Sequence, residues 1–494
     1  MEYNQELALL KEQLKDNIKS WYPMEENVQY IIIRDFCKRD VDKLKEAVEK
    51  LNENGKILIL MNNRLSIRSI CINNSKTEYL YSKKEIEELL DKIGLTYKKF
   101  YYPLPNCEMT NVIFTDKHLP DEETISRNIV FNEAEDIELN KENELYKNII
   151  KQDKNLFRIF ANCFFIECSK SEFEDNEIEF VSFSNMRKEK YRIKTIIRGE
   201  NVYKENLNEK SISHIKNIER NIDILKSCNI NTLDRYENSI IISDYQKNKD
   251  TLDKILIEKL KLGNVEEVKK IMKNLYFEIQ QKLEISETDK NVFDKYEIAY
   301  EKEDISNLTF IKYGFWDMIL QNIFYIDEKY FFYDQEWLEE NIPIEFLIYR
   351  TITYNPEVVK YLNLKKLLDE FNITDKNISL FQILDNKLQE KTRNETAWKI
   401  HTQVNNLDKI INNLNAKYDE IKKLQNDKET ITQDCKKLLN EKDARIKFLE
   451  DNMEQTVQLL QEKENQILLM ENSTSWKITE PLRKIRSNKK GAQK

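Results

Sequence analysis

The chain has 494 residues, enough for two or three domains, and its 79 Lys and Arg against 88 Asp and Glu give a net charge of −9. This mild acidity argues against nucleic-acid binding, so nucleic acid is not an expected partner. Only six glycines are present and no two lie within ten residues, which excludes the glycine-rich dinucleotide, Walker and kinase loops in their standard form.

The chain carries no pattern for metal binding by cysteine, for secretion or for membrane insertion. Its seven cysteines are scattered without a Cys-x-x-Cys pair, and only three histidines are present. The first residues are charged, and the longest apolar stretches reach only about ten residues, too few for a membrane span. We therefore expect a cytoplasmic protein with reduced thiols, whose membrane contact is at most peripheral.

Residues 1–170 read as an α/β region. Ser82 and Glu85 form a capping box that predicts the start of a helix, which Gly94 ends. Apolar runs predict strands at 30–33, 57–61, 97–102 and 163–168, with helices at 41–51, at 82–93 and in the charged stretch before the last strand. This alternation is typical of the second half of a Rossmann-type sheet.

Three segments of this region, 54–64, 81–85 and 100–105, resemble the C-terminal half of class I SAM-dependent methyltransferases from bacterial surface-polysaccharide loci. The resemblance covers roughly residues 28–170. That family binds SAM on a glycine-rich turn after its first strand, whereas residues 1–54 contain no glycine. We therefore expect an incomplete Rossmann-like, methyltransferase-related domain without a SAM site, in which methyl transfer would need the missing half from a partner chain.

Residues 171–390 show strands first and helices afterwards, the order of a protein-kinase-like bilobal domain. The pattern predicts strands at 180–183, 191–197, 202–204 and 240–242 and helices at 212–225, 249–262 and 265–283.

Further along, Asp317 and Asn322 precede two aromatic strands at 323–326 and 330–333, and Asp334 follows the second strand. Because such a hairpin brings its two ends together, Asn322 and Asp334 should lie side by side. Phosphoryl transfer needs a carboxylate for the acceptor hydroxyl and oxygen ligands for Mg²⁺.

The segment 315–337 resembles the aminoglycoside-phosphotransferase and lipopolysaccharide-kinase branch of the kinase fold, which ends this hairpin in Asp-x-Glu as Asp334-Gln-Glu336 does. The resemblance implies ATP and Mg²⁺ as cofactors, Asp317 as the catalytic base, and Asn322 and Asp334 as metal ligands. It also implies Lys204 as the phosphate-contacting lysine and Glu219 as its ion-pair partner. Lys194 remains the alternative to Lys204, because the strand register is open.

Two features depart from that family pattern. Trp316 stands where His or Gly usually precedes the catalytic Asp, and the first hairpin turn, residues 184–190, is basic instead of glycine-rich. Arg187, Lys188 and Lys190 in this turn either hold phosphates by charge or form an exposed hairpin tip.

Residues 391–472 read as one long helix with an apolar seam at 3–4 spacing, running from Val404 to Met470. Heptads of this length predict a coiled coil and therefore self-association, although a helix folded back on its own domain is the alternative.

In the tail, 473–494, the stretch from Trp476 to Lys494 has seven basic residues and one acidic one. It suits a basic amphipathic helix on an anionic membrane surface, and a disordered basic tail is the alternative. Its Ser475-Trp-Lys-x-Thr-x-Pro-Leu-Arg483 also resembles a short element of bacterial polysaccharide glycosyltransferases.

The order of parts resembles the bifunctional kinase–methyltransferases that cap growing O-antigen chains. That resemblance implies an ATP/Mg²⁺-dependent kinase of a sugar or glycan hydroxyl, working with glycosyltransferases of a polysaccharide locus at the inner face of the plasma membrane. The alternative is a catalytically inactive pseudokinase scaffold that organises glycosyltransferases through its coiled coil.

Overall fold

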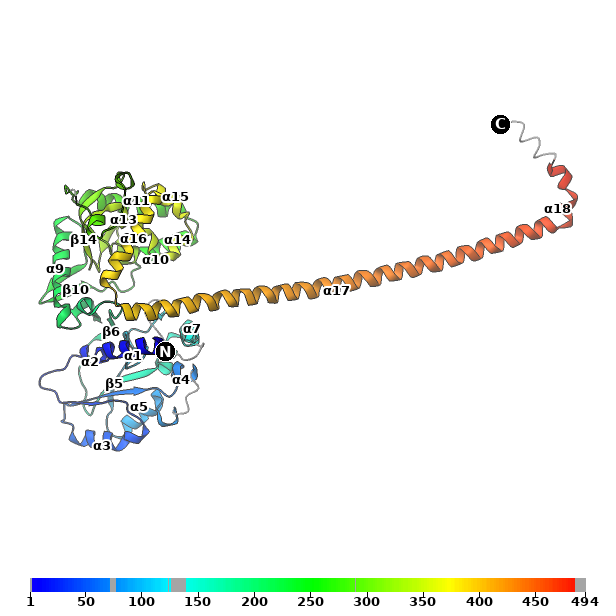
Figure 1. The fold of residues 1–494 in the computed structure, drawn as a ribbon. Helices are drawn as coiled ribbons and strands as arrows, with labels where there is room; N and C mark the ends of the chain where they lie inside the picture. Colours follow the sequence, from blue (N-terminus) through cyan, green and yellow to red (C-terminus); the bar gives the residue numbers. More distant parts are fainter. Residues whose placement is uncertain (1, 72–76, 123, 126–138, 289, 485–494) are drawn as a thin grey trace. The chain divides into compact units, whose positions relative to one another are not determined.

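The computed structural model describes the chain except residues 1, 72–76, 123, 126–138, 289 and 485–494 (Figure 1). The chain forms two compact units, residues 1–406 and 407–494. It is a mixed α/β protein with one large sheet, many helices and a long C-terminal helix.

A ten-stranded sheet dominates the first unit, in the order β1-β2-β5-β3-β4-β6-β7-β8-β10-β9. Its strands are β1 (Tyr30–Ile33), β2 (Lys56–Asn62), β3 (Tyr97–Leu104), β4 (Val112–Thr115), β5 (Cys163–Ser169), β6 (Ile178–Phe183), β7 (Ile193–Arg198), β8 (Asn201–Asn206), β9 (Asp234–Glu237) and β10 (Ile240–Asp244). The β4–β6 pairing carries the sheet past residue 170, where the sequence suggested a domain boundary. Strands from both sides of that position therefore share one hydrogen-bonded sheet.

The pairing in this sheet is mostly antiparallel. β1 and β2 pair in parallel around α3 (Val41–Lys50), as a Rossmann-type unit requires, whereas β5 runs antiparallel to both β2 and β3. Among the described strands of the sheet, the parallel pairing is confined to β1 and β2, so the expected Rossmann-type half extends over that single βαβ unit. β2 and β5 are buried along almost their whole length, which explains their continuous apolar sequences.

The helices of residues 1–170 begin with α1 (Glu2–Leu14) and α2 (Asn17–Ser20), which the apolar pattern did not predict. The remaining ones are α4 (Ile67–Cys71), α5 (Lys83–Lys92), α7 (Leu139–Gln152) and α8 (Phe157–Phe160). α5 starts at the expected capping box, in which the Ser82 hydroxyl accepts a hydrogen bond from the Glu85 N–H and the Glu85 carboxylate accepts one from the Ser82 N–H.

The C-terminal half of the first unit is mainly helical around one large apolar core. Its helices are α9 (Ile212–Ser227), α10 (Leu252–Lys261), α11 (Val265–Lys282), α12 (Val292–Lys295), α13 (Ile344–Thr353), α14 (Pro356–Lys360), α15 (Leu364–Asp369) and α16 (Asp375–Thr392). Two small antiparallel sheets complete it: β11 (Phe310–Phe315) with β14 (Leu338–Pro343), and β12 (Ile323–Ile326) with β13 (Lys329–Phe332). The predicted strands, the hairpin and the long helices of this region are confirmed.

The long helix α17 (Glu395–Asn472) has 78 residues and leads to α18 (Thr474–Ile478). Within residues 407–494, large apolar side chains of α17 are exposed, among them Leu438, Leu449, Met453, Leu460 and Ile467. In the tail, the Arg483 guanidinium lies 3.7 Å from the ring centre of Trp476. The rest of the predicted tail helix, 485–494, lies outside the described residues. Across the described part of the chain, every helix is too short or too polar to cross a bilayer.

Candidate active site

A cavity of about 550 Å³ lies in the first unit, lined by residues from four separate segments. These segments are the basic turn after β6, the stretch from Trp316 to Trp337, α13, and the end of α16 with the start of α17. Asp317, Asn322 and Asp334 all line it. The three side chains that the sequence grouped therefore face one cavity.

The hairpin brings Asn322 and Asp334 together for local reasons. Asp327 and Glu328 form its turn with positive φ angles of 50° and 60°, the conformation of a tight two-residue hairpin turn. Ile323 then pairs with Phe332, and the Tyr333 N–H donates a 3.2 Å hydrogen bond to the Asn322 carbonyl. Asp334 itself has a φ of 60°, so the chain turns directly after the second strand.

The backbone carbonyl of Asp317 is fixed by two side-chain amides. Asn322 Nδ2 donates to it at 3.0 Å, and Gln335 Nε2 donates to it at 3.1 Å. Next to it, Arg350 Nε donates to the Trp316 carbonyl at 2.8 Å. These donors hold the main chain at Asp317 without using its carboxylate.

The Asp317 carboxylate itself is the unusual group of the cavity. Burial raises the pKa of Asp317 to about 7, and the positive charge of Arg350 only partly opposes this. Among the described residues, this carboxylate forms no hydrogen bond or ion pair. A carboxylate with a pKa near neutrality, placed in a cavity, has the property required of a general base.

Glu336 is the buried centre of a charge cluster behind the cavity. Its carboxylate pairs with Arg187, with Lys204 Nζ at 3.0 Å and with His214 Nε2 at 3.2 Å, and it is only 3% exposed. Burial alone would raise the pKa of Glu336, but the charges of Arg187 and Lys204 and the His214 contact hold it well below its usual range.

Lys204 reaches the site, whereas its predicted partner does not. It contacts the Asp334 carboxylate as well as Glu336, so it bridges two acidic side chains. Glu219 is not its ion-pair partner, because the buried face of α9 presents His214 and Asn221 towards this cluster and leaves Glu219 half-buried at the side of that face. Lys194, the alternative lysine, instead pairs with Glu205 at 3.0 Å and donates to the Ser20 carbonyl.

The basic turn 184–190 does not form a free hairpin tip. Arg187 points inward to Glu336 and lies 5.3 Å from the ring centre of Trp337. The Lys188 N–H donates to the Thr392 carbonyl at 2.7 Å, and the Asn394 N–H donates to the Met186 carbonyl at 2.7 Å. The turn is thereby tied to the junction between α16 and α17.

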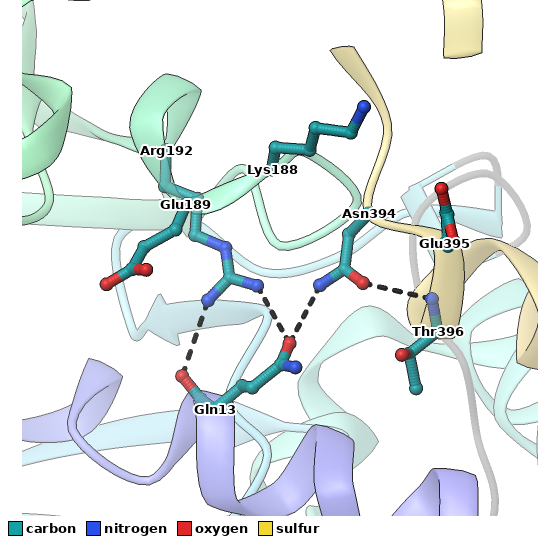
Figure 2. A pocket seen from close by; sticks show the side chains of 7 residues that line it. All are labelled: Gln13, Lys188, Glu189, Arg192, Asn394, Glu395 and Thr396. Carbon is teal, nitrogen blue, oxygen red and sulfur yellow. Dashed lines mark hydrogen bonds between the residues drawn. The ribbon is translucent and has the colours of Figure 1, made fainter. Parts of the chain in front are cut away.

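A second cavity, of about 380 Å³, is lined by residues of the same junction, of the basic turn and of α1 (Figure 2). Figure 2 shows Arg192 and Asn394 both reaching Gln13 of α1, with hydrogen bonds of 3.1 and 2.9 Å to its side-chain oxygen. The Asn394 side chain also accepts the Thr396 N–H, which caps the start of α17. The polar groups that line this second cavity therefore join α1, the segment that holds Arg192 and the start of α17.

Comparisons with known proteins give little further information. No family model matches this chain, and no curated protein matches it. Among solved structures, the choline kinase LicA from Streptococcus pneumoniae aligns with a TM-score of 0.22 and 10% sequence identity, over 43% of this chain and 94% of that one. Such a low TM-score does not establish a shared fold.

The sequence did not identify His214, Arg350 or Trp398 as parts of the site region. His214 and Arg350 sit on helices whose apolar pattern only signals a core, and their partners are more than 30 positions away. Trp398 lies in the expected long helix before Val404, where the predicted apolar seam begins, and no site was expected there. For Arg350 the sequence does hold a clue: a charged residue stands within an otherwise apolar helical segment, and the structure shows that it is buried.

Proposed function

We propose that this protein is an ATP- and Mg²⁺-dependent kinase that phosphorylates a sugar or glycan hydroxyl. The observation that carries the proposal is the convergence of Asp317, Asn322 and Asp334 on one cavity, with Lys204 on Asp334. The acceptor oxygen would bond to the γ-phosphorus, the bond to the bridging oxygen of ADP would break, and the hydroxyl proton would pass to Asp317. A pKa of about 7 suits Asp317 to accept that proton near neutral pH.

The residues present fit a hard divalent cation. Asn322 uses its amide nitrogen on the Asp317 carbonyl, so its amide oxygen is available, and Asp334 supplies a carboxylate. Within the described residues, no three His, Cys, Asp or Glu side chains gather to hold a metal, and the proposed donor set combines one carboxylate with one amide oxygen. When bound there, Mg²⁺ would neutralise charge on the phosphates.

Lys204 and Arg187 would supply the remaining positive charge for the triphosphate. Both form ion pairs with carboxylates next to the cavity. Arg187 would bind phosphate through its charge, in place of the backbone N–H groups of a glycine-rich turn. Lys204 on its strand is fixed by two acidic partners, which limits its rotamers before any nucleotide arrives.

The wider role rests on the sequence resemblance. We propose a place in cell-surface polysaccharide synthesis, with self-association through α17, glycosyltransferases as partners, and contact with the inner face of the plasma membrane through the basic tail. The exposed apolar side chains of α17 and the pairing of Trp476 with Arg483 in the tail are compatible with these assignments.

The test compares ATP turnover of the full-length protein with that of Asp317→Asn, using Asp327→Asn as the matched control. Asp327 lies in the exposed turn of the same hairpin. We expect the first variant to lose ~10²–10⁴-fold in rate, the usual contribution of a general base, and the control to keep full activity. Equal turnover by wild type and Asp317→Asn would contradict the proposal.

A non-enzymatic scaffold is the second candidate, and the charge cluster favours it. Asp334 and Glu336 are already neutralised by Lys204 and Arg187, so the site is electrostatically satisfied without nucleotide or metal. A thermal-shift titration distinguishes the two candidates: Mg-ATP should raise the melting temperature of the wild type but not of Asp334→Asn. If Mg-ATP leaves the wild type unchanged, the scaffold function is supported.

A further inference from the structure

Trp398 brings an exposed aromatic ring into the wall of the catalytic cavity. It lies in the first turn of α17, where its N–H donates a 2.9 Å hydrogen bond to the Asn394 carbonyl. The side chain is 39% exposed although it lines a cavity that also holds Asp317. A partly exposed aromatic ring in the same cavity as a candidate catalytic base offers a place for part of a substrate.

The other tryptophans of the cavity have no free face. Trp337 is stacked between His214, at 4.7 Å, and Trp316, at 5.6 Å. The Arg350 guanidinium lies 4.8 Å from the ring centre of Trp316, which is only 5% exposed. These rings are packed against protein groups, whereas Trp398 is the tryptophan of this cavity with the largest exposed fraction, 39%.

Two guanidinium groups lie at the exposed aromatic rings of this cavity. The Arg393 guanidinium lies 4.9 Å from the ring centre of Trp398, and the His401 ring lies 5.7 Å from it in a tilted orientation. Arg350 lies 5.2 Å from the ring of Tyr354, the other exposed aromatic residue of the cavity. Both guanidinium groups are paired with carboxylates, Arg393 with Glu390 at 3.6 Å and Arg350 with Asp385, so their charge is balanced within the protein.

Two neutral amides complete the recognition chemistry. Gln321 and Gln389 line the same cavity, and their side-chain amides form no hydrogen bond to any described residue. Free amides can donate and accept hydrogen bonds at the same time, which matches hydroxyl groups. An aromatic face with neutral amides around it is suited to a ring that has one apolar C–H face and hydroxyls at its edge.

We propose that the sugar ring of the acceptor stacks on Trp398, with Gln321 and Gln389 binding its hydroxyls and one hydroxyl directed to Asp317. This inference rests on the proposed kinase function and identifies the acceptor subsite for it. The first turn of the long helix thus takes part in substrate selection, in addition to its place in the predicted coiled coil.

Saccharide binding without nucleotide tests the subsite. Full-length protein is titrated with methyl glycosides of glucose, galactose, mannose, rhamnose and N-acetylglucosamine, and saturation-transfer NMR reports contacts to the ring C–H protons. We expect at least one glycoside to bind, its dissociation constant to rise at least tenfold in Trp398→Ala, and Trp398→Phe to retain most of the affinity. Trp476→Ala, which removes a tryptophan outside the cavity, should bind like the wild type.

The outcomes separate this inference from the kinase proposal. If no glycoside binds the wild type, or if Trp398→Ala binds equally well, the acceptor subsite is wrong, whatever the result for ATP turnover. Binding that depends on Trp398 in a protein without ATP turnover would keep the subsite and overturn the kinase. Gln389→Leu, on the surface of the same wall, gives a second test if Trp398→Ala does not fold: it should weaken glycoside binding and leave the melting temperature unchanged.

Discussion

Replacement of Asp317 by Asn gives a direct physical test of the cavity, because it should change how stability depends on pH. Asn is neutral at every pH and has nearly the same shape as a protonated Asp. In the wild type, burial raises the pKa of Asp317 to about 7 in the folded state, whereas an unfolded Asp titrates near ~3.9. The folded protein therefore holds a proton here that the unfolded chain releases.

The linkage relation gives the size of the effect. Between these two pKa values the folded state binds more protons than the unfolded state, so the free energy of unfolding falls as the pH rises. For a shift to about 7, the Asp317 carboxyl costs ~1.5 kcal/mol at pH 5 and ~4 kcal/mol at pH 8. Relative to the wild type, Asp317→Asn should gain ~2–3 kcal/mol in unfolding free energy between pH 5 and pH 8.

Urea unfolding followed by tryptophan fluorescence measures this difference, since Trp316 and Trp337 lie next to the site. Asp327→Asn is the control, and its curve should run parallel to that of the wild type. Parallel curves for Asp317→Asn as well would refute the raised pKa, and with it the assignment of Asp317 as a base that titrates near pH 7. The same pKa predicts an acid limb near pH 7 in the kcat/KM profile of the active enzyme.

Further variants test the charge cluster, the packing and the long helix. Glu336→Gln should cost ~3–5 kcal/mol in unfolding free energy, because it removes the buried negative charge that Arg187 and Lys204 share, whereas Glu340→Gln at an exposed ion pair should cost less than ~1 kcal/mol. Gly314→Ala should cost ~1–3 kcal/mol by urea unfolding, because the added Cβ would lie 2.2 Å from a side chain of the neighbouring strand. Leu449→Asp should shift the protein towards monomer in sedimentation velocity, whereas Lys447→Asp, off the seam, should not. An oligomer that survives Leu449→Asp, or a Glu336→Gln variant as stable as the wild type, would contradict these assignments.

The sequence predicted the elements of the first unit better than their pairing. Apolar runs such as 57–61 and 163–168 show that a strand is buried, but they do not show its direction, and β2 and β5 turned out to be antiparallel neighbours. β4 has only four residues and no alternating pattern, so the link between the two halves of the sheet could not be expected. Pairing depends on which strands meet in space, and local sequence carries little of that information.

In the candidate site, contacts between residues close in sequence could be predicted, whereas contacts between distant segments could not. Asn322 and Asp334 are joined by one hairpin, and the sequence was sufficient to place them together. The partner of Lys204 is more than 120 positions away, and the choice of Glu219 failed because helical phase put His214 on the inner face instead. The absence of glycine from the turn 184–190 was also informative. It excluded a glycine-rich loop there, and in the structure a charged side chain of this turn, Arg187, reaches the site instead.

The cluster around Glu336 connects the architecture to the choice between enzyme and scaffold. Lys204 lies on β8 of the large sheet and Arg187 lies in the turn between β6 and β7, whereas Asp334 and Glu336 follow the β12–β13 hairpin. These ion pairs therefore hold the two parts of the first unit together. Removal of one partner from such a buried pair costs several kcal/mol, so a nucleotide that bound these cations would have to replace the lost contacts with its own phosphates. An enzyme would make that exchange with Mg-ATP at each turnover, whereas a scaffold would keep the pairs. Hydrogen exchange at β8 with and without Mg-ATP therefore distinguishes the two, because only an exchange of partners would alter the protection of the strand that carries Lys204.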